Sequence, residues 1–170
     1  TRILELRQMI MKFHERGIMV VMDMVYNHMM STVNMDNIVP GYYFRSDYLG
    51  RYTNGSGCGN ELASERPMVR KFIIDSCLHW IKDYKIDGIR FDLMELLDID
   101  TTKEIVKKTT KLDKNFLIYG EPWKGGSSPL VNGTYKGSQK NENFSIFNDT
   151  FRDAIRGNNH PSSGFIIGNQ

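Results

Sequence analysis

The stretch VVMDMVYNH, residues 20–28, is the first of three apolar runs that lead directly into polar and acidic residues; the other two are DGIRFD (87–92) and FLIYGEPW (116–123). Continuous apolar runs of this kind are typical of strands that are buried on both faces, as in a parallel sheet. The carboxyl ends of parallel strands meet at one rim of a sheet or barrel. The three runs therefore predict an α/β fold that gathers polar side chains from distant parts of the chain.

Helical patterns lie between these runs. Apolar residues at spacings of three and four predict helices over 2–16, from Ser64 to Tyr84, and over 101–112. The expected strands are 18–22, 86–92, 116–121 and a short fourth strand at 145–147, with a long loop over 29–63, a Gly/Ser-rich loop over 124–140 and a last helix over 149–156. This alternation implies a parallel sheet, which an open doubly wound fold and a closed barrel both satisfy. The Gly-rich phosphate turn that often follows a strand of an open sheet is absent from the sequence.

Bulk composition excludes several classes of function. The chain has 170 residues, 40% of them hydrophobic, and its 22 basic and 20 acidic residues leave a net charge of +2. That balance gives no case for a nucleic acid or an acidic membrane as partner, since either would favour a concentrated basic face, and no apolar run approaches the roughly 20 residues that span a bilayer. Cys58 and Cys77 have neither metal-site nor disulfide-framework spacing, and we expect two free thiols. Cytoplasmic, cell-surface and secreted locations all remain open.

The motifs resemble those of the α-amylase superfamily, glycoside hydrolase family 13. DMVYNH (23–28) is similar to the first signature region of that family, GIRFD (88–92) to the second, and Glu121 after Ile118, Tyr119 and Gly120 to the third. Further segments are typical of type I pullulanases, the starch-debranching branch: NGSGCGN (54–60), ASERP (63–67), FDLM (91–94), EPW (121–123) and FNDTFRDAIRG (147–157). The resemblance covers essentially the whole chain.

The resemblance implies an incomplete (β/α)8 TIM barrel. By analogy the chain holds roughly strands three to six of the barrel with their helices. The fourth signature region of the family, a His-Asp pair, is absent, and so is a tyrosine-bearing motif expected shortly before Thr1. We therefore expect residues 1–170 to be an internal fragment of the catalytic barrel domain of a longer enzyme, with the start and end of the barrel and a third catalytic aspartate outside it.

The resemblance also assigns roles to individual residues. It implies that Asp92 is the catalytic nucleophile and that Glu121 is the catalytic acid/base. Cleavage of a glycosidic bond requires such a pair of carboxyl groups, which lie about 5–5.5 Å apart in retaining enzymes. The remaining expected site residues are substrate-binding His28, Arg90, Trp123, Asn27 and Met94, with Asp23 as structural support.

Arg90 lies two positions before Asp92, so on a strand both side chains point to the same side, where the guanidinium would orient the carboxylate. We expect no metal in this segment and no cofactor. Some relatives use the residue matching Asn27 for calcium, so calcium use by a longer parent protein stays open, although this segment supplies no self-contained set of oxygen ligands.

The expected function is that of a retaining glycoside hydrolase fragment acting on α-1,6 branch links in pullulan, starch or glycogen-type α-glucans. The α-1,6 preference is implied by the resemblance alone. An α-1,4-acting amylase or neopullulanase of the same superfamily is one alternative. A catalytically inactive α-glucan-binding piece is the other. The expected partner is an α-glucan oligosaccharide or polysaccharide.

Overall fold

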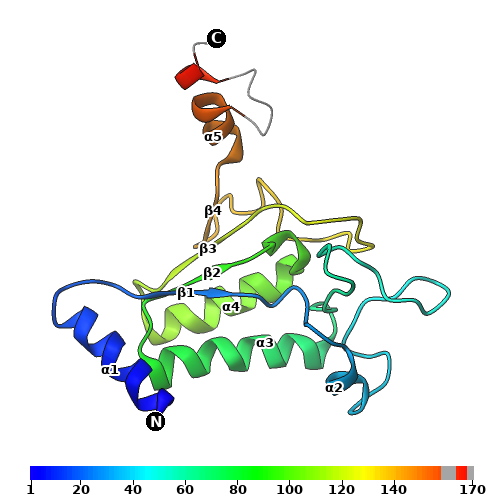
Figure 1. Ribbon diagram of the computed structural model, residues 1–170, viewed down its shortest axis with the longest axis horizontal. Coiled ribbons are helices and arrows are strands. Elements are labelled where there is room, and N and C mark those ends of the chain that lie inside the picture. Colours follow the sequence, from blue (N-terminus) through cyan, green and yellow to red (C-terminus); the bar gives the residue numbers. More distant parts are fainter. Residues whose placement is uncertain (158–163, 168–170) are drawn as a thin grey trace.

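Four strands form one parallel sheet in the order β1-β2-β3-β4 (Figure 1). The structure, a computed structural model, describes residues 1–157 and 164–167. The strands are β1 (Val21–Met24), β2 (Gly88–Phe91), β3 (Leu117–Gly120) and β4 (Ser145–Ile146). Their order in the sheet follows their order in the chain, with helices in the first two crossovers, which is the arrangement of consecutive βα units in a barrel. The expected α/β fold class is thereby confirmed.

The four predicted helices are found in their expected places, whereas α2 (Val33–Asp36) lies inside the predicted loop 29–63 and the two 3₁₀ turns were not predicted. The helices and helical turns are α1 (Arg2–His14), α2, α3 (Pro67–His79), a π-helical turn (Trp80–Tyr84), a 3₁₀ turn (Met94–Leu96), α4 (Ile99–Leu112), α5 (Asp149–Arg156) and a 3₁₀ turn (Phe165–Ile167). Pro67 occupies the first position of α3, where its missing N–H costs no helical hydrogen bond. Asp98 caps α4 by accepting a hydrogen bond from the Thr101 amide, and Asn148 caps α5 in the same way through Phe151.

One strand boundary differs from the prediction. The first strand was expected over 18–22, but β1 runs from Val21 to Met24 because pairing with β2 begins where Val21 lies opposite Gly88. Just before this point, the Val20 amide donates to the Asp87 carboxylate rather than to a strand. The strand therefore ends closer to Asn27 and His28 than the apolar run alone indicated.

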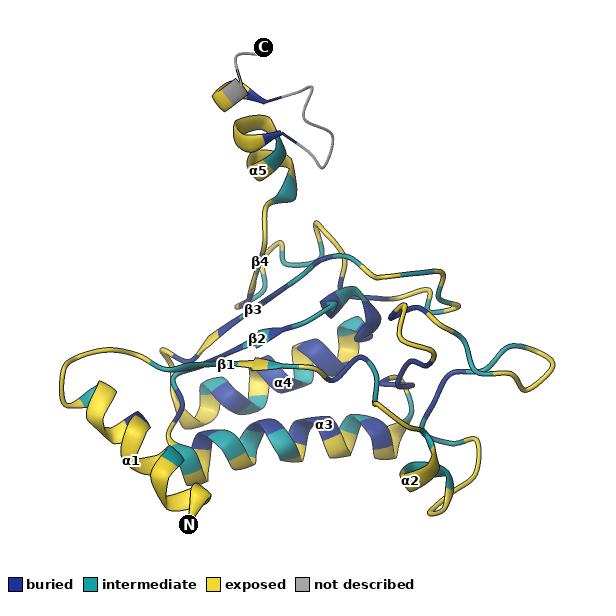
Figure 2. Cartoon of the chain, in the orientation of Figure 1, coloured by how far each residue is buried: buried dark blue, intermediate teal, exposed yellow. Residues whose placement is uncertain are grey.

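The core lies between the sheet and helices α3 and α4, which cover one face of it (Figure 2). Successive side chains of a strand point to opposite faces. Ile89 and Ile118, which lie in register on β2 and β3, are buried beside Ile73 and Ile105 of the two helices. The next residues along the strands also lie side by side across the sheet and form a polar row. They are Asp23 on β1, Arg90 on β2, Tyr119 on β3 and Ser145 on β4. That polar row therefore occupies the face away from α3 and α4.

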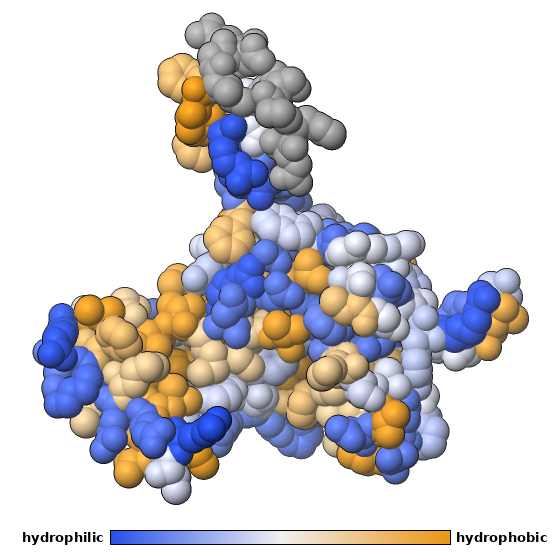
Figure 3. Space-filling model, viewed as in Figure 1, coloured by the Kyte–Doolittle hydropathy of each residue, from blue (hydrophilic) through white to orange (hydrophobic). Residues whose placement is uncertain are grey.

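Helices α1 and α5 are much less covered. Of the apolar positions predicted to form the buried side of α1, only Ile10 is buried, while Ile3, Met9 and Phe13 are exposed. No part of the described chain packs over them, and apolar and polar side chains are mixed on that surface (Figure 3). Helix α5 projects from the rest of the molecule beyond β4 (Figure 1). None of the described helices is apolar over a length that would cross a bilayer.

Candidate active site

The backbone brings Asp92, Glu121 and Phe147 to one rim of the sheet. Each follows the end of a strand and continues the hydrogen-bond ladder with the strand before it. The amide of Asp92 donates to the Met24 carbonyl at 3.1 Å, that of Glu121 to Phe91 at 3.0 Å, and that of Phe147 to Gly120 at 3.0 Å. The carboxyl ends of parallel strands thus assemble these side chains, as the sequence predicted for Asp92 and Glu121.

Arg90 connects the acidic residues of this rim. Its Nη1 lies 2.8 Å from Asp23 Oδ1 and 3.2 Å from Asp92 Oδ1, and its Nη2 lies 2.5 Å from Glu121 Oε1. Burial alone would lower the pKa of Arg90, but Asp23, Glu121 and Asp92 outweigh it and raise that pKa above its usual value. One permanently charged guanidinium therefore bridges Asp92 and Glu121, so the two carboxyl groups lie close enough to share a partner.

The backbone after β2 fixes the second oxygen of Glu121. The Leu93 amide donates to Glu121 Oε2 at 3.0 Å. Leu93 adopts the left-handed conformation, with φ 41° and ψ 52°, which is uncommon for a residue with a side chain. This turn directs the N–H that follows Asp92 toward Glu121. Both oxygens of the Glu121 carboxylate thus accept hydrogen bonds, and its orientation is set from two sides.

Asn27 supports Asp92 from the opposite side. Its Nδ2 donates to the Asp92 carbonyl at 2.8 Å and to Asp92 Oδ2 at 2.9 Å. Its Oδ1 lies 2.5 Å from Nδ1 of His28, which can donate there in the corresponding tautomer. Asn27 is fully buried, whereas His28 is partly exposed. The arrangement leaves the second ring nitrogen of His28 for another partner.

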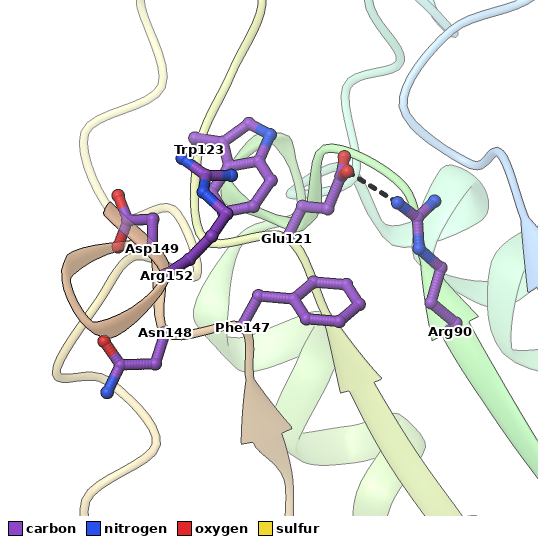
Figure 4. Close-up of a pocket in the computed structure, with 7 residues that line it drawn as sticks. All are labelled: Arg90, Glu121, Trp123, Phe147, Asn148, Asp149 and Arg152. Atoms are coloured by element: carbon purple, nitrogen blue, oxygen red, sulfur yellow. Dashed lines mark hydrogen bonds and ion pairs between the residues drawn. The ribbon is translucent and has the colours of Figure 1, made fainter. Parts of the chain in front are cut away.

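A cavity of about 390 Å³ opens beside this network (Figure 4). Its lining residues are Arg90, Glu121, Trp123, Phe147, Asn148, Asp149 and Arg152. The Trp123 and Phe147 rings are stacked, with centroids 6.3 Å apart. The Arg90 guanidinium lies 5.7 Å from the Phe147 centroid and that of Arg152 lies 5.8 Å from the Trp123 centroid. Flat aromatic faces beside carboxylates and guanidinium groups suit a polyhydroxylated ring, which has both apolar faces and hydroxyl edges.

The structure does not bring every predicted residue into the cavity. Met94 is fully buried, with its side chain against Gly120, so the expectation that it lines the pocket is corrected. Asn27 also has no exposed surface and lies behind Asp92. Asp23 is well exposed and reaches the site only through Arg90.

Phe147, Asp149 and Arg152 line the cavity, although the sequence reasoning gave them no site role. The available signal was their position, since FNDTFRD (147–153) starts at the last residue of the fourth expected strand, 145–147.

The described residues contain no group of three or more His, Cys, Asp or Glu side chains arranged to hold a metal ion. The Arg90 guanidinium occupies the place between Asp23, Asp92 and Glu121. The two cysteines, both within the described residues, are free thiols as predicted; Cys58 is exposed and Cys77 buried. Burial raises the pKa of the Cys77 thiol to about 12, so it has little thiolate character near neutral pH.

Comparisons with known proteins agree with this geometry. No protein-family model matches the chain. It is 42% identical over 176 residues to a pullulanase from Bacillus subtilis (strain 168), a match that covers 99% of this chain and 24% of that protein. It is 35% identical to isoamylase 3 (chloroplastic) from Oryza sativa subsp. japonica, over 89% of this chain and 21% of that protein. Among solved structures, a pullulanase from Anoxybacillus sp. LM18-11 complexed with maltotetraose superposes with a TM-score of 0.93 at 43% identity, over 99% of this chain and 26% of the other.

Fold and sequence together place the chain with the pullulanases and isoamylases. Within that group it belongs to the pullulanase family, and it spans 24% of the length of the first relative described.

Proposed function

We propose that residues 1–170 form part of the catalytic (β/α)8 barrel of a retaining glycoside hydrolase that cleaves α-1,6 branch links in pullulan, starch or glycogen-type α-glucans. The observation that carries this proposal is the bridging of Asp92 and Glu121 by Arg90 beside an open cavity. Two carboxyl groups that share one guanidinium at the rim of a sheet support a glycosidase pair, for which double displacement requires a separation of about 5–5.5 Å. The maltotetraose in the Anoxybacillus complex supports an α-glucan as the partner.

In this mechanism Asp92 attacks the anomeric carbon while Glu121 protonates the departing glycosidic oxygen. Asp92 is suited to the attack because Arg90 and Asn27 both hydrogen-bond to its carboxylate and fix its direction. Water then displaces Asp92 from the glycosyl-enzyme intermediate, with Glu121 acting as the base. His28, whose Nδ1–H faces Asn27 Oδ1, would accept a hydrogen bond from a hydroxyl of the bound sugar through Nε2, and the Trp123 and Phe147 rings would contact the faces of the sugar.

The experiment uses the full polypeptide that carries these residues. Asp92→Asn should lower kcat on pullulan on the order of 10⁴-fold or more, because a neutral amide cannot form the intermediate. Glu121→Gln should lower it by about 10²–10⁴-fold, the usual contribution of general acid catalysis. Asp75→Asn and Glu104→Gln, on the helices, are matched controls that should retain activity. Full turnover by Asp92→Asn would refute the assignment of the nucleophile.

Two product analyses separate the alternatives. Hydrolysis of pullulan but not amylose supports α-1,6 cleavage, whereas release of maltose oligomers from amylose alone indicates an α-1,4-acting amylase. The anomeric configuration of the first product, followed by NMR, tests retention directly. A folded protein that binds maltotetraose without turning over any α-glucan would indicate the inactive binding module.

A further inference from the structure

A second acidic residue, outside the proposed site, is completely buried. The Glu61 carboxylate has no exposed surface, and it accepts hydrogen bonds from Arg45 Nη1 at 2.9 Å, Thr53 Oγ1 at 2.5 Å and Ser128 Oγ at 2.7 Å. A buried carboxylate is retained only where such partners compensate its lost hydration. The proposed chemistry uses none of these groups, and none lines the cavity beside Glu121.

The partners of Glu61 lie in two loops that are joined backbone to backbone. The Gly55 carbonyl accepts from the amides of Gly125 at 2.9 Å and Gly126 at 2.8 Å. A Cβ atom at Gly125 would lie 2.3 Å from the Ser56 carbonyl oxygen, and one at Gly126 would lie 2.5 Å from that of Asn54. Only glycine permits this approach. We call this contact between residues 53–61 and 125–128 the glycine junction.

The glycine junction holds the far end of the loop that carries the site. Glu121 follows β3 directly, Trp123 comes two residues later, and Gly125 follows two residues after that. The β3 ladder anchors one end of this short loop and the glycine junction anchors the other. The segment from Glu121 to Gly125 is therefore held at both ends, by the Glu121 amide on Phe91 and by Gly125 on Gly55, and displacement of the junction would shift Trp123 and the Glu121 carboxyl group beside it relative to Asp92.

We propose that Glu61 is a positioning residue for the catalytic acid, acting through Ser128 and the glycine junction. The inference rests on the proposed function, because it assumes that Glu121 protonates the leaving group. It predicts an effect that depends on the leaving group. The glycosidic oxygen of a glucan needs a well-placed proton donor in order to leave. Fluoride is a weak base and leaves without protonation.

The test measures kcat/KM on pullulan and on α-maltosyl fluoride with the full polypeptide. Ser128→Ala removes one hydroxyl from the Glu61 cluster, and Ser127→Ala removes a neighbouring exposed hydroxyl as the matched control. Ser128→Ala should lower kcat/KM on pullulan about tenfold, because a misplacement of about 1 Å costs on the order of 10²-fold and a smaller shift is expected here, with kcat/KM on the fluoride changed less than about twofold. Ser127→Ala should match the wild type on both substrates.

Glu61→Gln should lower kcat/KM on pullulan relative to kcat/KM on the fluoride by more than Ser128→Ala does, provided that the variant folds. The result with Ser128→Ala decides the inference if Glu61→Gln does not fold. Equal losses on both substrates for Ser128→Ala, or no loss on either, would overturn the positioning role. Glu121→Gln separates this outcome from failure of the proposed function, because it should lower kcat/KM on pullulan by about 10²–10⁴-fold while sparing kcat/KM on the fluoride, which reports the glycosylation step alone. If Glu121→Gln lowered both activities equally, the acid assignment itself would fall.

Discussion

Two arginines in this molecule each bind several carboxylates, and they differ in what surrounds them. Arg90 bonds Asp23, Asp92 and Glu121 at a rim that opens into a cavity. Arg45 bonds Glu61 and Glu65, and also the Leu96 carbonyl, with its own side chain only 4% exposed. The pairing chemistry is the same. Access decides the difference, because Arg90 and Glu121 line the cavity, whereas Arg45 and Glu61 are buried away from it.

The comparison implies that the two arginines fail in different ways when replaced. Arg45 should matter mainly for folding, since its removal leaves the Glu61 carboxylate without its charged partner inside the protein. Arg90 should matter mainly for turnover, because the side chains of Asp23, Asp92 and Glu121 all keep some contact with solvent. Three experiments test or sharpen this contrast, from the largest expected effect to the smallest.

Arg45→Met should lower the free energy of unfolding of the full polypeptide by about 3–5 kcal/mol, the usual effect of breaking a buried ion pair from one side. Arg51→Met is the matched control on the same loop, where an exposed arginine pairs with Asp47, and should cost less than about 1 kcal/mol. Urea unfolding followed by circular dichroism measures both. A loss for Arg45→Met no larger than that of the control would remove the contrast.

Arg90→Lys should reduce turnover about 10²-fold with little change in unfolding temperature. Lysine keeps the charge but lacks the planar fork that reaches Asp23, Asp92 and Glu121 together, and small errors in the position of reacting groups cost about this much. Steady-state kinetics and thermal unfolding of the same preparation separate the two effects. Arg16→Lys, on an exposed segment after α1, is the control. Loss of stability without loss of turnover would mean that Arg90 stabilises the fold and does not position the reacting groups.

Asp98 offers a smaller test, based on pH. Burial alone would raise its pKa, but hydrogen bonds from Thr101 and Ser64 and the charge of Arg70 outweigh it and lower the pKa below its usual value. A lowered folded-state pKa contributes stability above the unfolded value, about 3.9, and this contribution is lost as the pH falls through the folded value.

Asp98→Asn should therefore be less stable than the wild type at pH 7, by about 1 kcal/mol, the upper range for an ion pair such as Asp98 with Arg70. The difference should shrink below about pH 4. Urea unfolding at pH 7 and pH 3 measures it, and an unchanged difference between the two pH values would contradict the argument.

The sequence predicted the fold well where apolar periodicity was strong. Strands β2 and β3 and helices α3 and α4 lie where their patterns placed them, because their burial depends on partners within the same segment. The prediction was less accurate for α1, whose apolar side is largely exposed in the described structure. Periodicity identifies a face that favours burial, but it does not identify what covers that face.

The site was predictable in part for a related reason. Asp92 and Glu121 stood out because each follows a buried strand, and the structure places both at one rim. Phe147 was missed because β4 has only two residues and gives little strand signal. Met94 was placed in the pocket by its nearness to Asp92 in sequence, but the left-handed turn at Leu93 sends it into the core. The glycine junction was also beyond sequence reasoning, since it depends on a contact between loops some 70 residues apart.

The Leu93 amide has a consequence for how this enzyme family is studied by mutagenesis. Its hydrogen bond to Glu121 comes from the main chain, so every residue except proline at position 93 would retain the donor. Side-chain scanning would therefore report position 93 as unimportant, or as merely sensitive to size. An amide-to-ester replacement at that bond, introduced by semisynthesis, would reveal what a complete substitution library leaves hidden.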